Sequence, residues 1–164
     1  MTTDVKELKQ ALVSGEVARA TTAAEQLAQL GEAAQPAAVE LAIASAAAPP
    51  LRDWASAALE ELGPPTTQDL PRLIPLLADA SADVGYWAAT LLGRLGEDGA
   101  PAVAGLIAAL SDSPHATVRE RAALALGKIG AGASAAAPAL TEAAAGGNAR
   151  LATLARDALA NIQA

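Results

Sequence analysis

The sequence predicts an all-α fold: a right-handed α-solenoid, or α–α superhelix, made of five stacked helical hairpins. Composition is the first reason, because the chain is 52% hydrophobic but only 2% aromatic, has no Phe and is very rich in Ala. Ala combines the highest helix propensity with a small side chain, so a core of Ala and Leu indicates closely packed helices. A β-sheet would instead favour Val, Ile, Thr and aromatic residues. An internal repeat of 32 to 34 residues is the second reason.

The repeat is clearest in the second helix of each predicted hairpin. Leu-Gly or Ile-Gly pairs end the first four copies with spacings of 32, 33 and 34 residues, and the fifth copy ends in Ile-Gln: Leu30-Gly31, Leu62-Gly63, Leu95-Gly96, Ile129-Gly130 and Ile162-Gln163. Three residues before each pair stands a Leu, and seven residues before it stands an Ala. These offsets define one face of a helix. The Gly is expected to end each helix in the left-handed conformation.

The first helices repeat more loosely but in the same register. Two apolar positions correspond across the copies: Leu8, Val39, Leu73, Leu106 and Leu140, and then Leu12, Ile43, Leu77, Leu110 and Ala144. Pro36, Pro71, Pro101 and Pro138 lie near the expected helix starts, where a missing N–H costs nothing. We therefore predict a single domain, residues 1–164, with repeats at about 4–31, 32–63, 64–96, 97–130 and 131–164.

Residues 112–130 carry a resemblance to a known family. Their second-helix portion reads Val118-Arg119-Glu120-Arg121-Ala122-Ala123-Leu124-Ala125-Leu126-Gly127-Lys128-Ile129-Gly130. This segment resembles a HEAT repeat of the short bacterial kind that is also found in phycobilin lyases. The third repeat keeps much of the pattern between Val84 and Gly96, with Gly85 where Arg is expected. The resemblance implies a HEAT-type solenoid, a fold that serves as a scaffold, a transport factor or, in a few cases, an enzyme.

Both ends of the array carry polar residues on one flank of the apolar stripe. Four residues before the pair, only the first copy is strongly polar (Gln26), and six residues before it, only the last copy is large and charged (Arg156). A terminal repeat lacks one neighbour, so that flank faces solvent. We therefore expect a complete five-repeat array in which Arg156 is exposed.

Charge and cysteine content exclude several classes of function. The formal net charge is −7 and the pI is about 4.6, with 11 basic residues spread singly, which argues against nucleic acid and against an anionic membrane surface. No Cys is present for a disulfide or a thiolate metal site. The N-terminus lacks an apolar signal segment. We expect a monomer in the cytoplasm, although a signal peptide removed beforehand would leave no trace.

No cluster in the sequence predicts a catalytic, cofactor or metal site. His115 is the only histidine, and without a second ligand or base it is expected at the surface or at a helix cap. The pairs Gly130-Gly132 and Gly146-Gly147 follow no strand, and neither has the Lys of a nucleotide loop, so they predict turns and not phosphate loops. Carboxylate pairs at Glu60-Glu61 and Glu97-Asp98 fall at repeat junctions, where solvated charge is expected.

The aromatic residues define the predicted partner-binding patch on the second helices. Trp54 and Trp87 hold the same repeat position, and Tyr86 holds a position that is polar in the other four copies. Aromatic anchors beside Arg are typical of binding hot spots. The predicted patch consists of Trp54, Tyr86, Trp87, Thr90, Arg94, Glu120, Arg121 and Lys128. The alternative is that each Trp only fills the groove between adjacent second helices.

These observations lead to one functional prediction and two alternatives. We predict a non-catalytic scaffold that binds a protein or peptide partner on the surface lined by the second helices. The mixed charge of that surface, which includes Asp53 and Glu61, would suit a partner with polar and basic features. One alternative is a tetrapyrrole-handling, lyase-like protein that uses Trp54, Tyr86, Trp87 and Asp53. The other alternative is a purely structural or self-assembling repeat module.

Overall fold

The computed structural model describes residues 4–164, all of which lie in helices or in the short segments between them. Residues 1–3, the start of the predicted domain, lie outside the described residues. The chain divides into two compact units, residues 1–66 and 67–164. The boundary falls between the second and third predicted repeats, and each unit is described by itself.

The first unit contains two helical hairpins. Its elements are α1 (Val5–Leu12), α2 (Val17–Leu30), η1 (Gly31–Ala37), α3 (Ala38–Ala44) and α4 (Leu51–Glu61), where η denotes a 3₁₀ helix. Within this unit, α1 packs on α2, α3 packs on α4, and the two second helices pack on each other. Asp4 caps α1 by accepting a hydrogen bond from the Lys6 amide at 2.9 Å.

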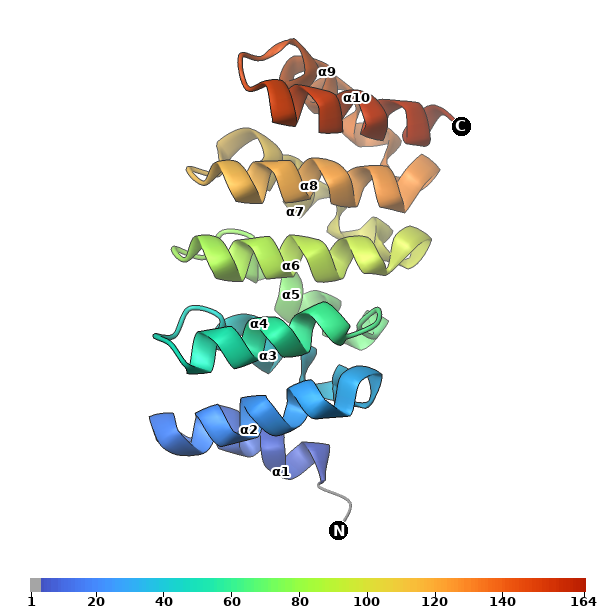
Figure 1. Cartoon of the computed structure of the whole chain (residues 1–164). Coiled ribbons are helices and arrows are strands. Elements are labelled where there is room, and N and C mark those ends of the chain that lie inside the picture. The colour runs from blue at the N-terminus through green and yellow to red at the C-terminus, as the bar shows by residue number, and fades with distance from the viewer. Residues whose placement is uncertain (1–3) are drawn as a thin grey trace. The chain divides into compact units, whose positions relative to one another are not determined.

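The second unit contains three hairpins. Its elements are η2 (Thr67–Asp69), α5 (Leu70–Leu76), α6 (Ala82–Arg94), η3 (Gly96–Ala102), α7 (Val103–Asp112), α8 (Ala116–Ile129), η4 (Gly130–Ala136), α9 (Ala137–Ala145) and α10 (Ala149–Gln163). Figure 1 shows α8 between α6 and α10 in one layer, and both neighbours contact it along its length. The first helices α5, α7 and α9 form the second layer. The prediction of an all-helical fold built from five helical hairpins is confirmed for the described residues.

Small residues let the second helices of this unit approach closely. A Cβ added to Gly93 would lie 2.9 Å from the Ala125 Cα, and one added to Gly127 would lie 2.9 Å from the Ala158 Cα. Both distances are too short for an ordinary contact, so only glycine fits at these two positions without a shift of the backbone. The Ala that recurs seven residues before each repeat end is buried in all five copies: Ala23, Ala55, Ala88, Ala122 and Ala155.

Three 3₁₀ helices connect repeats, and the sequence analysis did not foresee them. Each begins at the Gly that follows a second helix, and buried small residues follow at every third position: Ala34 and Ala37 in η1, Gly99 and Ala102 in η3, and Ala133 and Ala136 in η4. A period of three residues is that of a 3₁₀ helix. The spacing Gly-x-x-small-x-x-Ala is therefore the sequence signal for this connector.

Glycine ends three of the four predicted second helices with a positive φ. Gly31 and Gly130 have φ/ψ of 55/−127° and 72/−138°, and Gly96 has a φ of 57°. The expectation was wrong at Gly63, which has no positive φ. Here α4 ends at Glu61, and the next residue is extended. Two prolines follow Gly63, and a residue before proline is restricted to extended conformations.

The expected core position at Ile43 was also wrong, because its side chain is 46% exposed. The buried face of α3 contains Ala38, Leu41 and Ala42 instead, which is the spacing of one helix face. Glu40 of the same helix is also buried, and its carboxylate lies 3.6 Å from the Lys9 ammonium.

One continuous helical run, residues 116–145, is long and apolar enough to cross a membrane by length and composition alone. The run consists of α8, η4 and α9, and Ala133 inside it has non-helical dihedral angles. Of its most apolar window, 44% is buried within the fold. Core helices pass the same test, so this run is weak evidence for a membrane span.

Candidate partner-binding site

Tyr86 and Arg121 form the best-defined polar contact on the second-helix face of residues 67–164. The Arg121 guanidinium carbon lies 4.3 Å from the centroid of the Tyr86 ring, and Arg121 Nη2 donates a hydrogen bond to the phenolic oxygen. The two residues come from adjacent second helices, α6 and α8, and both are half-buried. A cation above an aromatic face is attracted by the negative charge of the ring face. The contact therefore holds Arg121 in one orientation.

Beside this contact lies a small cavity of about 170 Å³ that α6, α8 and α10 form together. Its lining consists of Tyr86, Thr117, Glu120, Arg121, Leu124, Arg150 and Leu154. We call this feature the second-helix hollow. Leu124 and Leu154 supply its apolar surface and are half-buried, whereas the other members are polar or aromatic. An apolar floor with a polar rim is the usual arrangement of a protein-binding surface.

The second-helix hollow contains more unpaired positive charge than unpaired negative charge. Glu120 is paired with Arg150, whose Nε lies 3.0 Å from the Glu120 carboxylate oxygen. Arg121 contacts Tyr86 and, among residues 4–164, pairs with no carboxylate. Lys128, two turns further along α8, is exposed and has no ion-pair partner among residues 4–164. The open charge along this stretch of α8 is therefore positive, although the whole chain carries a net charge of −7.

The two tryptophans of the predicted patch differ in exposure. Trp87 is only 7% exposed and makes an edge-to-face contact with Tyr86, with the ring centroids 5.2 Å apart. Its ring is therefore largely shielded from solvent. Trp54 belongs to the first unit and is 36% exposed. Of the predicted aromatic residues, the structure brings Tyr86 and Trp87 together.

The remaining predicted residues lie along α6 and α8. Thr90 donates a hydrogen bond from its hydroxyl to the Tyr86 carbonyl oxygen at 2.8 Å, so this hydroxyl is used within its own helix. Arg94 is the last residue of α6 and is half-buried. Glu120, Arg121 and Lys128 lie on α8. Thus Tyr86, Glu120 and Arg121 line the second-helix hollow, whereas Thr90, Arg94 and Lys128 do not.

Four members of the second-helix hollow were missed by the sequence analysis: Thr117, Leu124, Arg150 and Leu154. The repeat alignment holds a signal for one of them. Leu154 lies eight residues before its repeat end, the same position as Arg121 and Trp87. Glu120 and Tyr86 share the position before it. Arg150 could not be found in this way, because its role depends on the ion pair with Glu120.

Of the residues that the sequence analysis assigned to caps and turns, His115, Gly146 and Gly147 have those places in the structure, whereas Gly130 and Gly132 lie in the 3₁₀ helix η4. His115 is the N-cap residue of α8 by its extended dihedral angles, and its Nε2 lies 3.1 Å from the Ala80 carbonyl oxygen. Gly146 and Gly147 lie between α9 and α10. Within residues 4–164, no group of three or more His, Cys, Asp or Glu side chains could hold a metal ion.

The architecture defines a helical-repeat protein, built from paired helices whose neighbours repeat the same contacts. A family model for HEAT repeats matches residues 70–160, which is more than half of the chain. The chain therefore belongs to the HEAT-repeat family. A comparison with curated proteins gives no match.

Solved structures share the fold at low sequence identity. Two engineered proteins from the Northeast Structural Genomics Consortium have TM-scores of 0.67 and 0.63, each with 20% identity. The matches cover 98% of this chain in both cases, and 80% and 48% of the respective engineered chains. A designed armadillo repeat protein in complex with a (KR)4 peptide has a TM-score of 0.65 and 17% identity, covering 97% of this chain and 82% of its own. These similarities concern the fold alone.

Proposed function

We propose that this chain is a non-catalytic scaffold that binds a protein or peptide partner on the face formed by α6, α8 and α10. The observation that carries the proposal is the contact between Tyr86 and Arg121 at the edge of the second-helix hollow. An Arg that is already held in place loses little conformational freedom when a partner binds. Helical-repeat folds provide such fixed side chains along an extended surface. One structural neighbour, the designed armadillo protein, was solved with a bound peptide.

The chemistry of the hollow favours a partner segment with a carboxylate next to an apolar side chain. Arg121 has N–H donors that the contact with Tyr86 does not use, and Arg forms paired hydrogen bonds with carboxylates. Leu124 and Leu154 offer an apolar surface beside it. The sequence analysis expected a partner with basic features. In the second unit, that expectation depended on the carboxylate of Glu120. This carboxylate is already paired with Arg150 within the chain.

Charge reversal at one position tests the proposal. We would compare the proteins that chemical cross-linking captures on the wild type, on Arg121→Glu and on Arg19→Glu. Arg19 is an exposed arginine on α2, in the other unit, so its reversal changes the net charge equally without touching the hollow. We expect the cross-linked partner to be lost on Arg121→Glu and kept on Arg19→Glu. Cross-linked positions on the wild type should map to α8 and α10.

Two results would contradict the proposal. One is equal capture of every cross-linked protein by all three proteins, which would place the contact elsewhere on the chain. The other is concentration-dependent cross-linking of the chain to itself through α8 and α10, which would support the self-assembling module instead. Circular dichroism of both variants must match the wild type, so that a loss of capture reports binding and not unfolding.

A further inference from the structure

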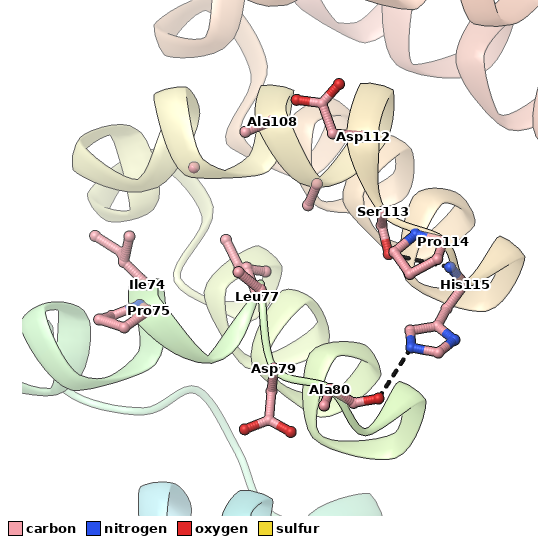
Figure 2. A pocket seen from close by; sticks show the side chains of 13 residues that line it. Ile74, Pro75, Leu77, Asp79, Ala80, Ala108, Asp112, Ser113, Pro114 and His115 are labelled. Atoms are coloured by element: carbon pink, nitrogen blue, oxygen red, sulfur yellow. Dashed lines mark hydrogen bonds between the residues drawn. The ribbon is translucent and has the colours of Figure 1, made fainter.

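A larger cavity within residues 67–164 lies on the first-helix side of the unit and shares no residue with the second-helix hollow. Figure 2 shows it between α5 and α7, bounded at one end by the segments that precede α6 and α8. It is half open and has a volume of about 650 Å³. The lining consists of Ile74, Pro75, Leu77, Ala78, Asp79, Ala80, Gly105, Ala108, Ala109, Asp112, Ser113, Pro114 and His115. We call it the first-helix groove.

Small side chains on α7 create this groove. A Cβ added to Gly105 would lie 3.1 Å from Ile74 Cγ2 and 3.2 Å from Leu77 Cδ1, so the two helices approach closely there. Further along α7, Ala108 and Ala109 extend too little to fill the space opposite α5. Figure 2 shows the side chains of Ile74 and Leu77 directed toward α7. The result is an apolar floor that remains partly open to solvent.

His115 closes one end of the groove. Its ring nitrogen Nε2 lies 3.1 Å from the Ala80 carbonyl oxygen, and its backbone N–H donates to the Ser113 hydroxyl at 3.3 Å. The first contact joins the segment before α6 to the segment before α8, and the second lies within the segment before α8 (Figure 2). Because both connections involve backbone atoms, the end of the groove is fixed before any partner arrives.

The charged residues of the lining are both acidic. Asp79 and Asp112 are exposed, and Figure 2 shows their carboxylates on opposite sides of the groove. Asp79 uses one oxygen to accept a hydrogen bond from the Ser81 amide at 2.8 Å. The lining contains no Lys or Arg. An apolar floor between two carboxylates is complementary to an apolar group that is flanked by positive charges.

We propose that the first-helix groove binds an amphipathic helical segment of a partner protein, with two apolar side chains one turn apart and Lys or Arg on either side. The wall from Gly105 to Asp112 covers eight residues of α7, or roughly 10 Å for the seven steps between them at about 1.5 Å per residue. Two side chains at positions i and i+4 are about 6 Å apart and fit within that length. Exposed alanines on the rim (Ala78, Ala80 and Ala108) let the backbone of a helix come close. Burying an apolar helix face in such a groove is a common mode of peptide recognition.

Selection from a peptide library tests this second site. The library displays helical 14-residue peptides with Leu fixed at two positions four residues apart and all other positions randomised. Peptides are selected on the wild-type chain and then counter-selected on Ala108→Trp, which fills the groove from its exposed rim. The matched control is Ala104→Trp, because Ala104 is also exposed on α7 but does not line the groove.

We expect peptides that bind the wild type and Ala104→Trp but bind Ala108→Trp about tenfold or more weakly. Their randomised positions should be enriched in Lys and Arg. For one such peptide, Asp79→Asn and Asp112→Asn should each weaken binding about two- to fivefold and reduce its salt dependence. Asn keeps an oxygen that can still accept the Ser81 amide hydrogen bond, so these variants change charge and not the turn.

Three outcomes would overturn the inference: no peptide distinguishes the two Trp variants, the surviving peptides are enriched in Asp or Glu, or both Asn variants bind as the wild type does. Arg121→Glu serves as an independent check, because it alters the second-helix hollow and should leave these peptides unaffected. If the proposal for the second-helix hollow is contradicted, the test of the first-helix groove is still valid. If the groove proposal is contradicted, the test of the hollow is still valid. Thermal melts of both Trp variants show whether each remains folded.

Discussion

The guanidinium of Arg121 lies over the ring of Tyr86 and also donates a hydrogen bond to its phenolic oxygen. The two residues are 35 apart in the sequence, one position more than the spacing of 34 between the ends of the third and fourth repeats. The contact therefore links neighbouring repeats at the surface, whereas most contacts between them are made by buried Ala, Gly and Leu. It is a stabilising contact, and in the proposed function it also holds Arg121 in place for a partner.

This contact predicts coupling between the two side chains in a double-mutant cycle. A half-buried cation–π contact contributes about 0.5–2 kcal/mol and a hydrogen bond about 1 kcal/mol. Urea unfolding of Tyr86→Ala, Arg121→Ala and the double variant should therefore give a coupling of about 1–2 kcal/mol. The control cycle pairs Tyr86→Ala with Asp98→Ala, because Asp98 is exposed and lies beyond the far end of α6. Control changes should add within about 0.5 kcal/mol, and additivity in the first cycle would contradict the contact.

Close packing of α8 on α10 predicts that Gly127 cannot be replaced even by Ala. The new Cβ would lie 2.9 Å from the Ala158 Cα and 3.1 Å from its Cβ. Ala raises helix propensity by about 1 kcal/mol, but overpacking against a backbone atom costs about 1–3 kcal/mol. We expect the free energy of unfolding of Gly127→Ala to fall by up to about 2 kcal/mol.

Gly147→Ala is the matched control for this prediction. Gly147 has no positive φ, and an added Cβ there meets no atom within 4 Å. Its unfolding free energy should stay within about 0.5 kcal/mol of the wild type. Equal stability of Gly127→Ala and Gly147→Ala would mean that α8 and α10 lie further apart than in the structure.

The repeat and its core could be predicted from the sequence because stacking imposes the same geometry on every copy. Ala seven residues before each repeat end is buried each time. The exceptions come from local backbone chemistry. Gly63 was expected to end a helix as the other glycines do, but the two prolines after it require an extended chain. Arg156 is exposed, as expected from its charge.

Partner surfaces were harder to predict, because they depend on distances between helices. Tyr86 could be singled out because the other copies are polar at its position, and Arg121 because it lies one repeat further on. Burial of Trp87 follows from its edge-to-face contact with Tyr86, which the sequence does not specify. The first-helix groove has no repeating signal at all. It arises where Gly105 brings α5 and α7 together and small residues then leave space between them.

The backbone at the end of α8 predicts a second glycine effect with a different cause. Gly130 has φ 72° and ψ −138°, a conformation that side chains with a Cβ rarely adopt, although an added Cβ would meet no atom within 4 Å. Gly130→Ala should therefore lower the unfolding free energy by about 1–3 kcal/mol through backbone strain alone. Gly63→Ala, with equal space around it and no positive φ, should be close to neutral. Similar losses in both variants would point to a cause other than the dihedral angles.

The unequal burial of the two tryptophans allows their roles to be separated by fluorescence. Trp87 is 7% exposed and Trp54 is 36% exposed, and the chain has only these two tryptophans. Trp54→Phe should leave the emission of Trp87, shifted to the blue and poorly quenched by acrylamide. Trp87→Phe should leave the emission of Trp54, shifted to the red and readily quenched. The loss of unfolding free energy on replacement by Ala should also be larger for Trp87 than for Trp54. Trp87→Ala removes a buried ring and costs about 3–5 kcal/mol, whereas Trp54→Ala should cost less. Equal quenching of the two single-tryptophan variants would mean that Trp87 is open to solvent, and its ring would then be able to contact a partner beside Tyr86.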